Sequence, residues 1–184
     1  MRSSWMVLIT CLCLVLFGLP SNAQESVKEL AAKASGELRL LNSLQTLERM
    51  TSQMNHFIVY SIEAERGGWR VMEKEVGNDY AIRSNAARVQ EEVARANNSI
   101  QKSKVATEGE LEGAESAVRN LNVLLALAPQ IADLISAKEF DQAATLYKEN
   151  GQSAHDNAIR GAQSSMTTVQ KRLGKTLLDL RIAK

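Results

Sequence analysis

The sequence predicts an all-α protein that folds as an antiparallel up-down-up-down four-helix bundle, with helices 1 and 4 longer than helices 2 and 3. The residues after the leader are rich in Ala, Leu, Glu, Gln, Lys and Arg, which favour helices. No run alternates Val, Ile, Thr and aromatic residues as a strand would. The capping-box pattern Ser/Thr-x-x-Glu, which marks helix starts, precedes three stretches of helical hydrophobic spacing, at Ser26–Glu29, Thr107–Glu110 and Ser136–Glu139.

Residues 1–23 have the form of a cleavable secretory signal peptide. Arg2 supplies the positive charge, Trp5–Pro20 is apolar, and Ser21-Asn22-Ala23 offers small residues for cleavage. The apolar stretch is 16 residues long, which is shorter than the about 20 residues that span a bilayer. We therefore expect one domain over residues 24–184, periplasmic or secreted, with an uncleaved membrane anchor as the alternative.

Composition excludes several classes of function. The chain has 22 Lys and Arg against 21 Asp and Glu, and Arg2 lies in the leader, so residues 24–184 carry no net charge. No long-range field then attracts nucleic acid or anionic lipid. Both cysteines, Cys11 and Cys13, lie in the leader, which excludes disulfides and cysteine catalysis. Pro129 interrupts the densest later apolar run, so we expect no stable membrane insertion after cleavage.

The first helix is expected from Val27 to about Arg66, where Gly67-Gly68 ends it. Its apolar stripe, with polar Thr51 in phase, consists of Leu40, Leu44, Leu47, Met54 and Ile58. The second helix is expected after the cap Gly77-Asn78-Asp79. Its seam is spaced alternately by four and three residues and consists of Ile82, Ala86, Val89, Val93, Ala96, Ile100 and Ser103.

The third helix is expected to run through Pro129, which removes one backbone donor and predicts a kink. Its apolar face consists of Leu111, Ala114, Val118, Leu121, Leu125, Ala128, Ile131 and Ile135. The fourth helix carries Phe140, Ala144, Tyr147, Ala154, Ala158, Met166, Val169, Leu173, Leu177 and Leu180. Because each helix is apolar on one side only, the four are expected to pack together as a bundle.

The expected helix lengths differ. At 1.5 Å per residue, helices 2 and 3 are about 40 Å long, and helices 1 and 4 are about 60–70 Å long. In up-down-up-down order the start of the first helix and the end of the fourth lie at the same end of the bundle. They would project there as a two-helix stalk, whose exposed stripes could pair with a second copy in a homodimer.

The sequence contains no catalytic motif. It has no Gly-rich phosphate loop after a strand, no Gly-x-Ser-x-Gly, no His-Glu-x-x-His and no Cys-x-x-Cys-His. The Glu-x-x-His pairs of di-iron bundles are also missing. Because no nucleophile–base pair or metal constellation appears, we expect a protein that is not an enzyme, with no metal and no cofactor.

His56 and His155 are expected at one level of neighbouring helices, an arrangement that would suit a metal clip or a proton switch. The seams favour solvated histidines instead, since His56 falls on the outer face and His155 flanks the fourth seam. A haem-carrying bundle is a further alternative, because haem iron can take methionine ligands and the chain has Met50, Met54 and Met166. Methionine at helical spacing is more often core packing.

The segment Ile131–Ile159, with Ala137-Lys138-Glu139-Phe140-Asp141-Gln142-Ala143 at the junction of helices 3 and 4, resembles the periplasmic four-helix-bundle sensor domain of methyl-accepting chemotaxis receptors. The resemblance covers about residues 27–183 and includes the lengthened outer helices. Such receptors continue into a membrane helix and a cytoplasmic coiled coil, whereas this chain stops at Lys184. The resemblance thus implies a sensory module that binds a small molecule and reports to a separate membrane receptor or kinase.

In this family, ligands bind between helices in the membrane-distal half, where arginine receives a carboxylate and aromatics cover the apolar part. The resemblance therefore implies ligand-binding candidates at that end: Tyr60, Arg66, Trp69, Arg70, Tyr147, His155 and Arg160. Trp69 is the strongest single candidate, because it lies outside the main seams. Surface charge is the favoured interpretation of the arginines, and core or interface packing that of Tyr60 and Tyr147. A structural or self-associating bundle that works through protein contacts is the alternative function.

Overall fold

The computed structural model describes residues 21–67 and 77–183, with side chains from Gln24 onward. Within these residues every regular element is a helix and no strand occurs, which confirms the all-α prediction. The elements are α2 (Ser21–Gly67), α3 (Asn78–Gln101), α4 (Glu108–Ser136), α5 (Phe140–Leu146), the π-helical turn η1 (Tyr147–Gly151) and α6 (Gln152–Ile182). The leader up to Pro20 and the connection that contains Trp69 and Arg70 lie outside the described residues.

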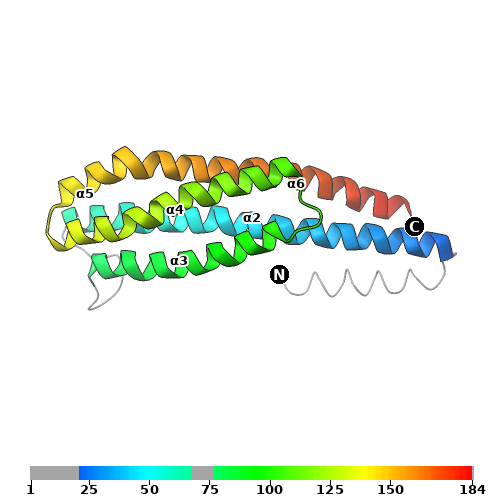
Figure 1. Cartoon of the computed structure of the whole chain (residues 1–184), viewed down its shortest axis with the longest axis horizontal. Helices are drawn as coiled ribbons and strands as arrows, with labels where there is room; N and C mark the ends of the chain where they lie inside the picture. The colour runs from blue at the N-terminus through cyan, green and yellow to red at the C-terminus, as the bar shows by residue number, and fades with distance from the viewer. Residues whose placement is uncertain (1–20, 68–76, 184) are drawn as a thin grey trace.

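Four long helices lie side by side along the long axis of the molecule (Figure 1). They contain 47 residues in α2, 24 in α3, 29 in α4 and 31 in α6. Both α3 and α6 pack against α2 and α4. The start of α2 and the end of α6 run on past the turn that joins α3 to α4 (Figure 1).

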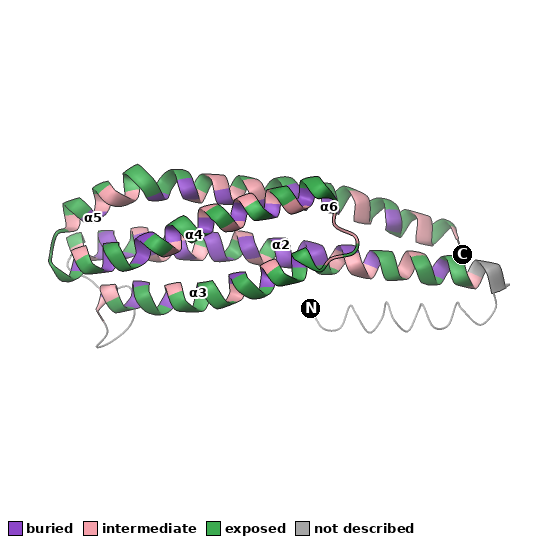
Figure 2. Ribbon diagram, in the orientation of Figure 1, coloured by how far each residue is buried: buried purple, intermediate pink, exposed green. Residues whose placement is uncertain are grey.

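Figure 2 colours the helices by burial. All five apolar residues predicted for the first helix are buried, as are most of those predicted for the second and third, where Leu124 and Leu127 are buried in addition. On the fourth helix the prediction is wrong at Leu177, which is 46% exposed, because this part of α6 runs on past α3 and α4 (Figure 1). Thr51, which lies in phase with the apolar stripe of the first helix, donates its hydroxyl to the Leu47 carbonyl at 2.9 Å. That bond lets a polar side chain occupy a core position at little cost. The largest fully buried apolar side chains are Leu40, Leu44, Leu47, Met54, Ile58, Ile82, Ile100, Leu121, Leu124 and Ile131.

Of the described helices, α4 alone is long and apolar enough to cross a membrane, judged by length and composition only. It passes that test although Pro129 lies inside it. Its apolar side chains Leu121, Leu124 and Ile131 are fully buried against the other helices. A core helix of a helical bundle has the same properties, so α4 is weak evidence for a membrane span.

One of the three predicted capping boxes is confirmed and two are wrong. The Thr107 side chain accepts the backbone N–H three residues on, and Glu110 accepts the Thr107 N–H at 2.9 Å. Ser26 instead lies inside α2, because the helix begins at Ser21. Ser136 is the last residue of α4, and its hydroxyl lies 3.0 Å from both the Ala132 carbonyl and Asp79.

The helix at Ser136 ends through backbone geometry. Lys138 adopts a left-handed φ of 65°, its N–H donates to the Ile135 carbonyl, and the Glu139 N–H donates to the Leu134 carbonyl. This pair of bonds is the Schellman arrangement, which satisfies the last carbonyls of a helix. The chain therefore reverses here without a side-chain cap, and α5 starts at Phe140.

The predicted fourth helix runs without a break from Phe140 to Ile182, but one of its turns is not α-helical. Between α5 and α6 the turn η1 widens to π-helical geometry over Tyr147–Gly151. A Cβ at Gly151 would lie 2.5 Å from Cδ2 of the Tyr147 ring. Glycine thus allows the wide turn to close against the tyrosine, and periodicity alone does not predict this feature.

Two glycines bring α4 and α6 into close contact. A Cβ on Gly161 would lie 2.7 Å from the Gly113 carbonyl oxygen and 3.1 Å from the Ala117 nitrogen. Both obstacles are backbone atoms, which cannot rotate away. The two helices can therefore approach at this level only because position 161 has no side chain.

We expect Gly161→Ala to lower the free energy of unfolding by about 1–3 kcal/mol, because the added methyl forces the two helices apart. Gly174→Ala, on the same helix, is the matched control, since a methyl added there would meet no neighbouring atom within 4 Å. That variant should gain up to about 1 kcal/mol from helix propensity. Urea unfolding followed by circular dichroism measures both, and equal effects of the two substitutions would contradict the close approach.

Candidate functional site

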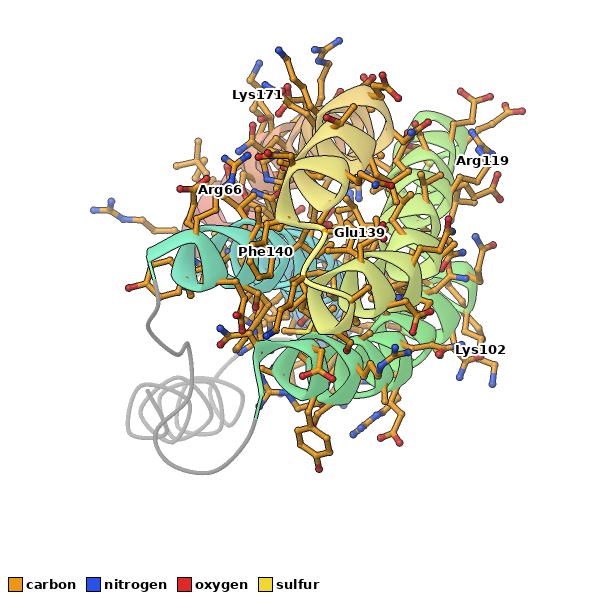
Figure 3. The ribbon with its side chains drawn as sticks, turned by 90° about the vertical axis from the view of Figure 1, so that its left-hand side faces the viewer. Arg66, Lys102, Arg119, Glu139, Phe140 and Lys171 are labelled. Atoms are coloured by element: carbon orange, nitrogen blue, oxygen red, sulfur yellow. The ribbon has the colours of Figure 1, made fainter. Side chains whose placement is uncertain are left out.

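Of the predicted ligand-binding residues that the structure describes, Arg160 lies furthest along the fourth helix, beside Gly161, which meets Gly113 near the start of α4. Tyr60 and Arg66 lie toward the end of the bundle where α2 ends and α5 begins. Arg66 is exposed but already engaged, because its guanidinium donates to Asp141 at 2.6 Å and lies 3.6 Å from Glu63. Figure 3 views the bundle from this end, with Arg66 and Phe140 labelled. A ligand carboxylate would have to displace Asp141 to reach Arg66.

Tyr60 is 41% exposed and therefore lies on the surface, not in the core. Its ring stacks on His56 one turn earlier, with centroids 4.9 Å apart and planes 20° from parallel. His56 is exposed, as its place on the outer face of the helix predicted. The two rings form an aromatic pair on the outside of α2.

Tyr147 is half-buried at the start of η1 and links the fourth helix to the first. Its hydroxyl donates to Oδ1 of Asn55. Burial raises the pKa of the Tyr147 phenol above the ordinary 10.0, the charge of Asp156 raises it further, and the bond with Asn55 lowers it. The phenol is thus held in its neutral form as a hydrogen-bond donor between α2 and η1.

His155 and Arg160 lie on α6, just after the π-helical turn. Nδ1 of His155 is 3.0 Å from Oδ1 of Asp156. Arg160 lines a surface hollow of about 330 Å³ that runs along η1 and the first turns of α6. The hollow is lined by Lys148, Gln152, Ser153, Asp156, Asn157 and Arg160. Two cations and four hydrogen-bonding side chains therefore line a shallow, open hollow on one side of this helix.

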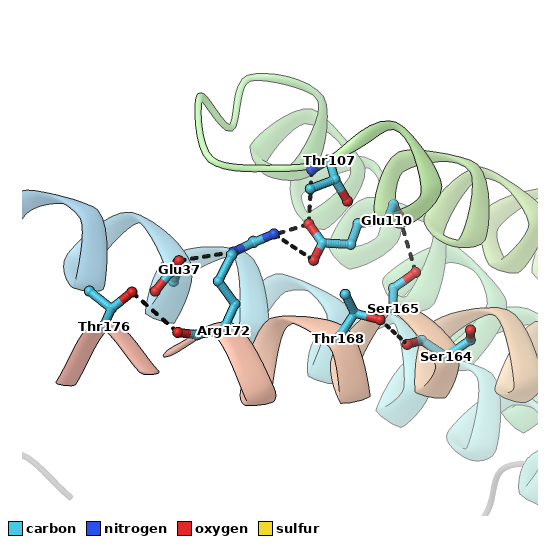
Figure 4. Close-up of polar contacts among 8 residues, drawn as sticks. All are labelled: Glu37, Thr107, Glu110, Ser164, Ser165, Thr168, Arg172 and Thr176. Atoms are coloured by element: carbon cyan, nitrogen blue, oxygen red, sulfur yellow. Dashed lines mark hydrogen bonds and ion pairs between the residues drawn. The ribbon is translucent and has the colours of Figure 1, made fainter. Parts of the chain in front are cut away.

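A second polar cluster, at the opposite end of the bundle, was not predicted. Arg172 of α6 donates through Nε to Oε1 of Glu37 on α2 at 2.9 Å (Figure 4). Its Nη1 and Nη2 donate to the two carboxylate oxygens of Glu110 on α4 at 2.8 and 3.1 Å. This Glu37–Arg172–Glu110 triad joins three helices, and the bidentate pair with Glu110 is the stronger of its two links.

The triad is buried. Glu37 is fully buried, Glu110 is 2% exposed and the Arg172 side chain is 21% exposed. Glu110 also accepts the Thr107 N–H, but Oε2 of Glu37 has no hydrogen-bond partner. Both carboxylates therefore depend on Arg172 as their counter-charge, because an unpaired buried charge lowers the free energy of unfolding.

The sequence did contain a signal for the triad. Glu37 follows Ala34 by three residues and precedes Leu41 and Leu44 by four and seven, so it lies in phase with the apolar stripe. Arg172 follows Val169 by three residues in the same way. A charge at a seam position predicts a buried ion pair, but the spacing does not reveal its partner on another helix.

Two further hollows contain none of the predicted ligand-binding residues. A hollow of about 440 Å³ is lined by Leu134, Asp141, Gln142, Thr145, Leu146 and Glu149. A smaller one of about 230 Å³ lies between α2 and α3. Over residues 21–67 and 77–183, no group of three or more His, Asp or Glu side chains is arranged to hold a metal ion.

Comparison with known proteins identifies no relative. No family model matches the chain, and neither the curated proteins nor the solved structures contain a significant match. The function is therefore inferred from the residues and the geometry described above.

We expect Arg172→Met to lower the free energy of unfolding by about 3–5 kcal/mol, because it leaves two buried carboxylates without a counter-charge. Arg119→Met is the control, since Arg119 is exposed and lies 3.8 Å from Glu115 on its own helix. Such a surface pair contributes about 0–1 kcal/mol. Denaturant unfolding measures both variants, and a small loss for Arg172→Met would show that the two carboxylates do not depend on Arg172 as their counter-charge.

The raised pKa of Tyr147 predicts that the free energy of unfolding falls at high pH. Because its pKa is raised in the folded state, the unfolded chain ionises first, so stability is complete below about pH 10 and is lost as the pH rises through the folded pKa. Tyr147→Phe should reduce this loss between about pH 9 and 11, and should cost about 1 kcal/mol at neutral pH through the missing bond to Asn55. Tyr80→Phe, at a 57% exposed residue, should leave the pH profile of urea unfolding unchanged.

Proposed function

We propose that this protein is an exported, non-catalytic four-helix sensory module that binds a small carboxylate-bearing molecule and acts through a separate membrane receptor or kinase. The proposal combines the leader and the resemblance to chemoreceptor sensor domains with the geometry along η1 and the first turns of α6. The observation that carries it is the hollow beside η1, in which predicted Arg160 lies with a second cation, Lys148.

The proposal includes an antiparallel, up-down-up-down order of the four helices. It is supported by contacts that pair the early part of one helix with the late part of its neighbour. These contacts are Ser43 with Ser99 and Gln53 with Asn85 between α2 and α3, Arg83 with Asp133 and Gln101 with Glu115 between α3 and α4, and Glu37 with Arg172 and Glu48 with Gln163 between α2 and α6.

The lining of the hollow favours an anionic or zwitterionic ligand. Lys148 and Arg160 offer up to about eight N–H donors between them, and the planar guanidinium suits the two oxygens of a carboxylate. Asp156 could receive an ammonium group, while Gln152, Ser153 and Asn157 add neutral hydrogen-bonding groups. Because the site is open to water, each ion pair is weak, and binding in the micromolar to millimolar range is expected.

The neighbouring turn offers a route from the hollow to the rest of the bundle. Lys148 belongs to η1, one residue after Tyr147, whose hydroxyl holds Asn55 of α2. π-helical turns occur frequently at functional sites. A ligand that draws Lys148 toward Arg160 would therefore act directly on the turn that links α6 to α2.

Ligand binding is tested by thermal unfolding with acetate, succinate, glycine and L-glutamate, each in the millimolar range. A molecule that binds the native state raises the melting temperature, so we expect at least one of the four to do so. Lys148→Gln/Arg160→Gln should abolish the rise. Arg119→Gln, which removes an exposed charge from the outside of α4, should preserve it. If none of the four shifts the wild-type transition, or if the shift survives in the double variant, the proposed site is wrong.

A further inference from the structure

We propose that the outward face at the end of α6 docks reversibly on the surface of an anionic lipid bilayer. This inference concerns the end of α6 that lies away from the hollow, and it does not depend on ligand binding. It rests on three observations: a cluster of exposed aliphatic side chains, their placement on a helix face that no described element covers, and the cations beside them.

Large apolar side chains are unusually exposed at this end. Six large hydrophobic side chains are exposed among the described residues, and three of them lie in the last six residues of α6. Leu177 is 46% exposed, Leu178 54% and Ile182 74%. Single exposed apolar residues need no explanation, but a cluster of large ones indicates an interaction site.

Two of these residues, Leu178 and Ile182, share one side of the helix with two lysines. Lys171, Lys175, Leu178 and Ile182 are spaced by four, three and four residues, so they form a stripe along α6. All four are exposed, and Lys171 points away from the other helices in Figure 3. Thr176, on the other side of this segment, is buried. The stripe therefore faces away from the bundle.

The charges beside the aliphatic residues are mainly positive. Lys171, Lys175 and Arg181 are exposed, and within the described residues no carboxylate lies within ion-pair distance of them. Asp179 is the one acidic residue among positions 171–183. The chain as a whole is nearly neutral, so this local excess of positive charge appears only when the exposed face is considered separately.

These charges favour an anionic surface over a second copy of the chain. In a parallel pair, Lys171 and Lys175 would each face their own counterparts, and such like-charge pairs are destabilising. Anionic headgroups instead attract each cation, which raises binding about fivefold per residue at the surface. Leu178 and Ile182 can enter the boundary between headgroups and acyl chains, as the apolar side chains of interfacial helices do.

Vesicle flotation tests the proposal. The purified protein should float with vesicles of phosphatidylglycerol and phosphatidylcholine at about 3:7, and it should remain unbound with pure phosphatidylcholine. Lys171→Gln/Lys175→Gln should weaken binding by more than about tenfold, by the charge contribution given above. Leu178→Gln/Ile182→Gln should also abolish flotation. Both pairs are exposed, so circular dichroism should show unchanged helix content and melting temperature.

Lys102→Gln/Lys104→Gln is the matched control. It removes two exposed cations from the turn between α3 and α4, where Lys102 lies across the bundle from Lys171 (Figure 3), and should bind vesicles as the wild type does. Equal loss in this control would show that net charge alone drives binding and would overturn the proposal. So would absence of flotation, or a concentration-dependent dimer in sedimentation that Leu178→Gln/Ile182→Gln dissolves, because the aliphatic residues would then serve a second copy.

Discussion

The structure depends most on the placement of one guanidinium between two buried carboxylates. Arg172 must reach Glu37 on α2 and Glu110 on α4 together, because an unpaired carboxylate at either position would be buried without compensation. The geometry is directional, since Nε of Arg172 donates to Glu37 and both terminal nitrogens donate to Glu110. Apolar side chains pack in many ways, but this triad accepts only one relative position of three helices. It therefore specifies the arrangement more than it adds net stability.

The neighbouring packing uses the same register. Ser165, two turns before Arg172, donates to the carbonyl of Glu110 at 3.1 Å. Gly161, one turn before Ser165, approaches the backbone of α4. A slide of α6 by one turn would remove Arg172 from Glu110 and bring larger side chains against Gly113. Polar specificity and close backbone contact thus constrain the same pair of helices, so α6 is held along α4 by two independent physical effects.

The sequence predicted what depends on local periodicity and missed what depends on other helices. Leu44, Leu47 and Ile82 are buried where the spacing placed them, because one-sided helices have only one way to remove apolar surface from water. Ser136 failed as a cap because the backbone at Lys138 could reverse without it. The π-helical turn depends on the fit of Tyr147 against Gly151. Of the seven candidate site residues, Arg160 lines a hollow, Arg66 is engaged by Asp141, and Trp69 and Arg70 stay predictions.

The two proposed sites and the arginine of the triad all lie on one segment of chain, from Lys148 to Ile182. The hollow is at its start, Arg172 lies about two-thirds of the way along, and the cationic aliphatic stripe is at its end. If a ligand altered the wide turn at η1, α6 could respond by local tilting but not by sliding freely, because sliding would strand Glu37 and Glu110 in the core. A conformational change at the hollow would then reach the stripe only if α6 rotated or bent about Arg172. On these proposals the buried triad is the pivot between ligand binding at one end and membrane contact at the other.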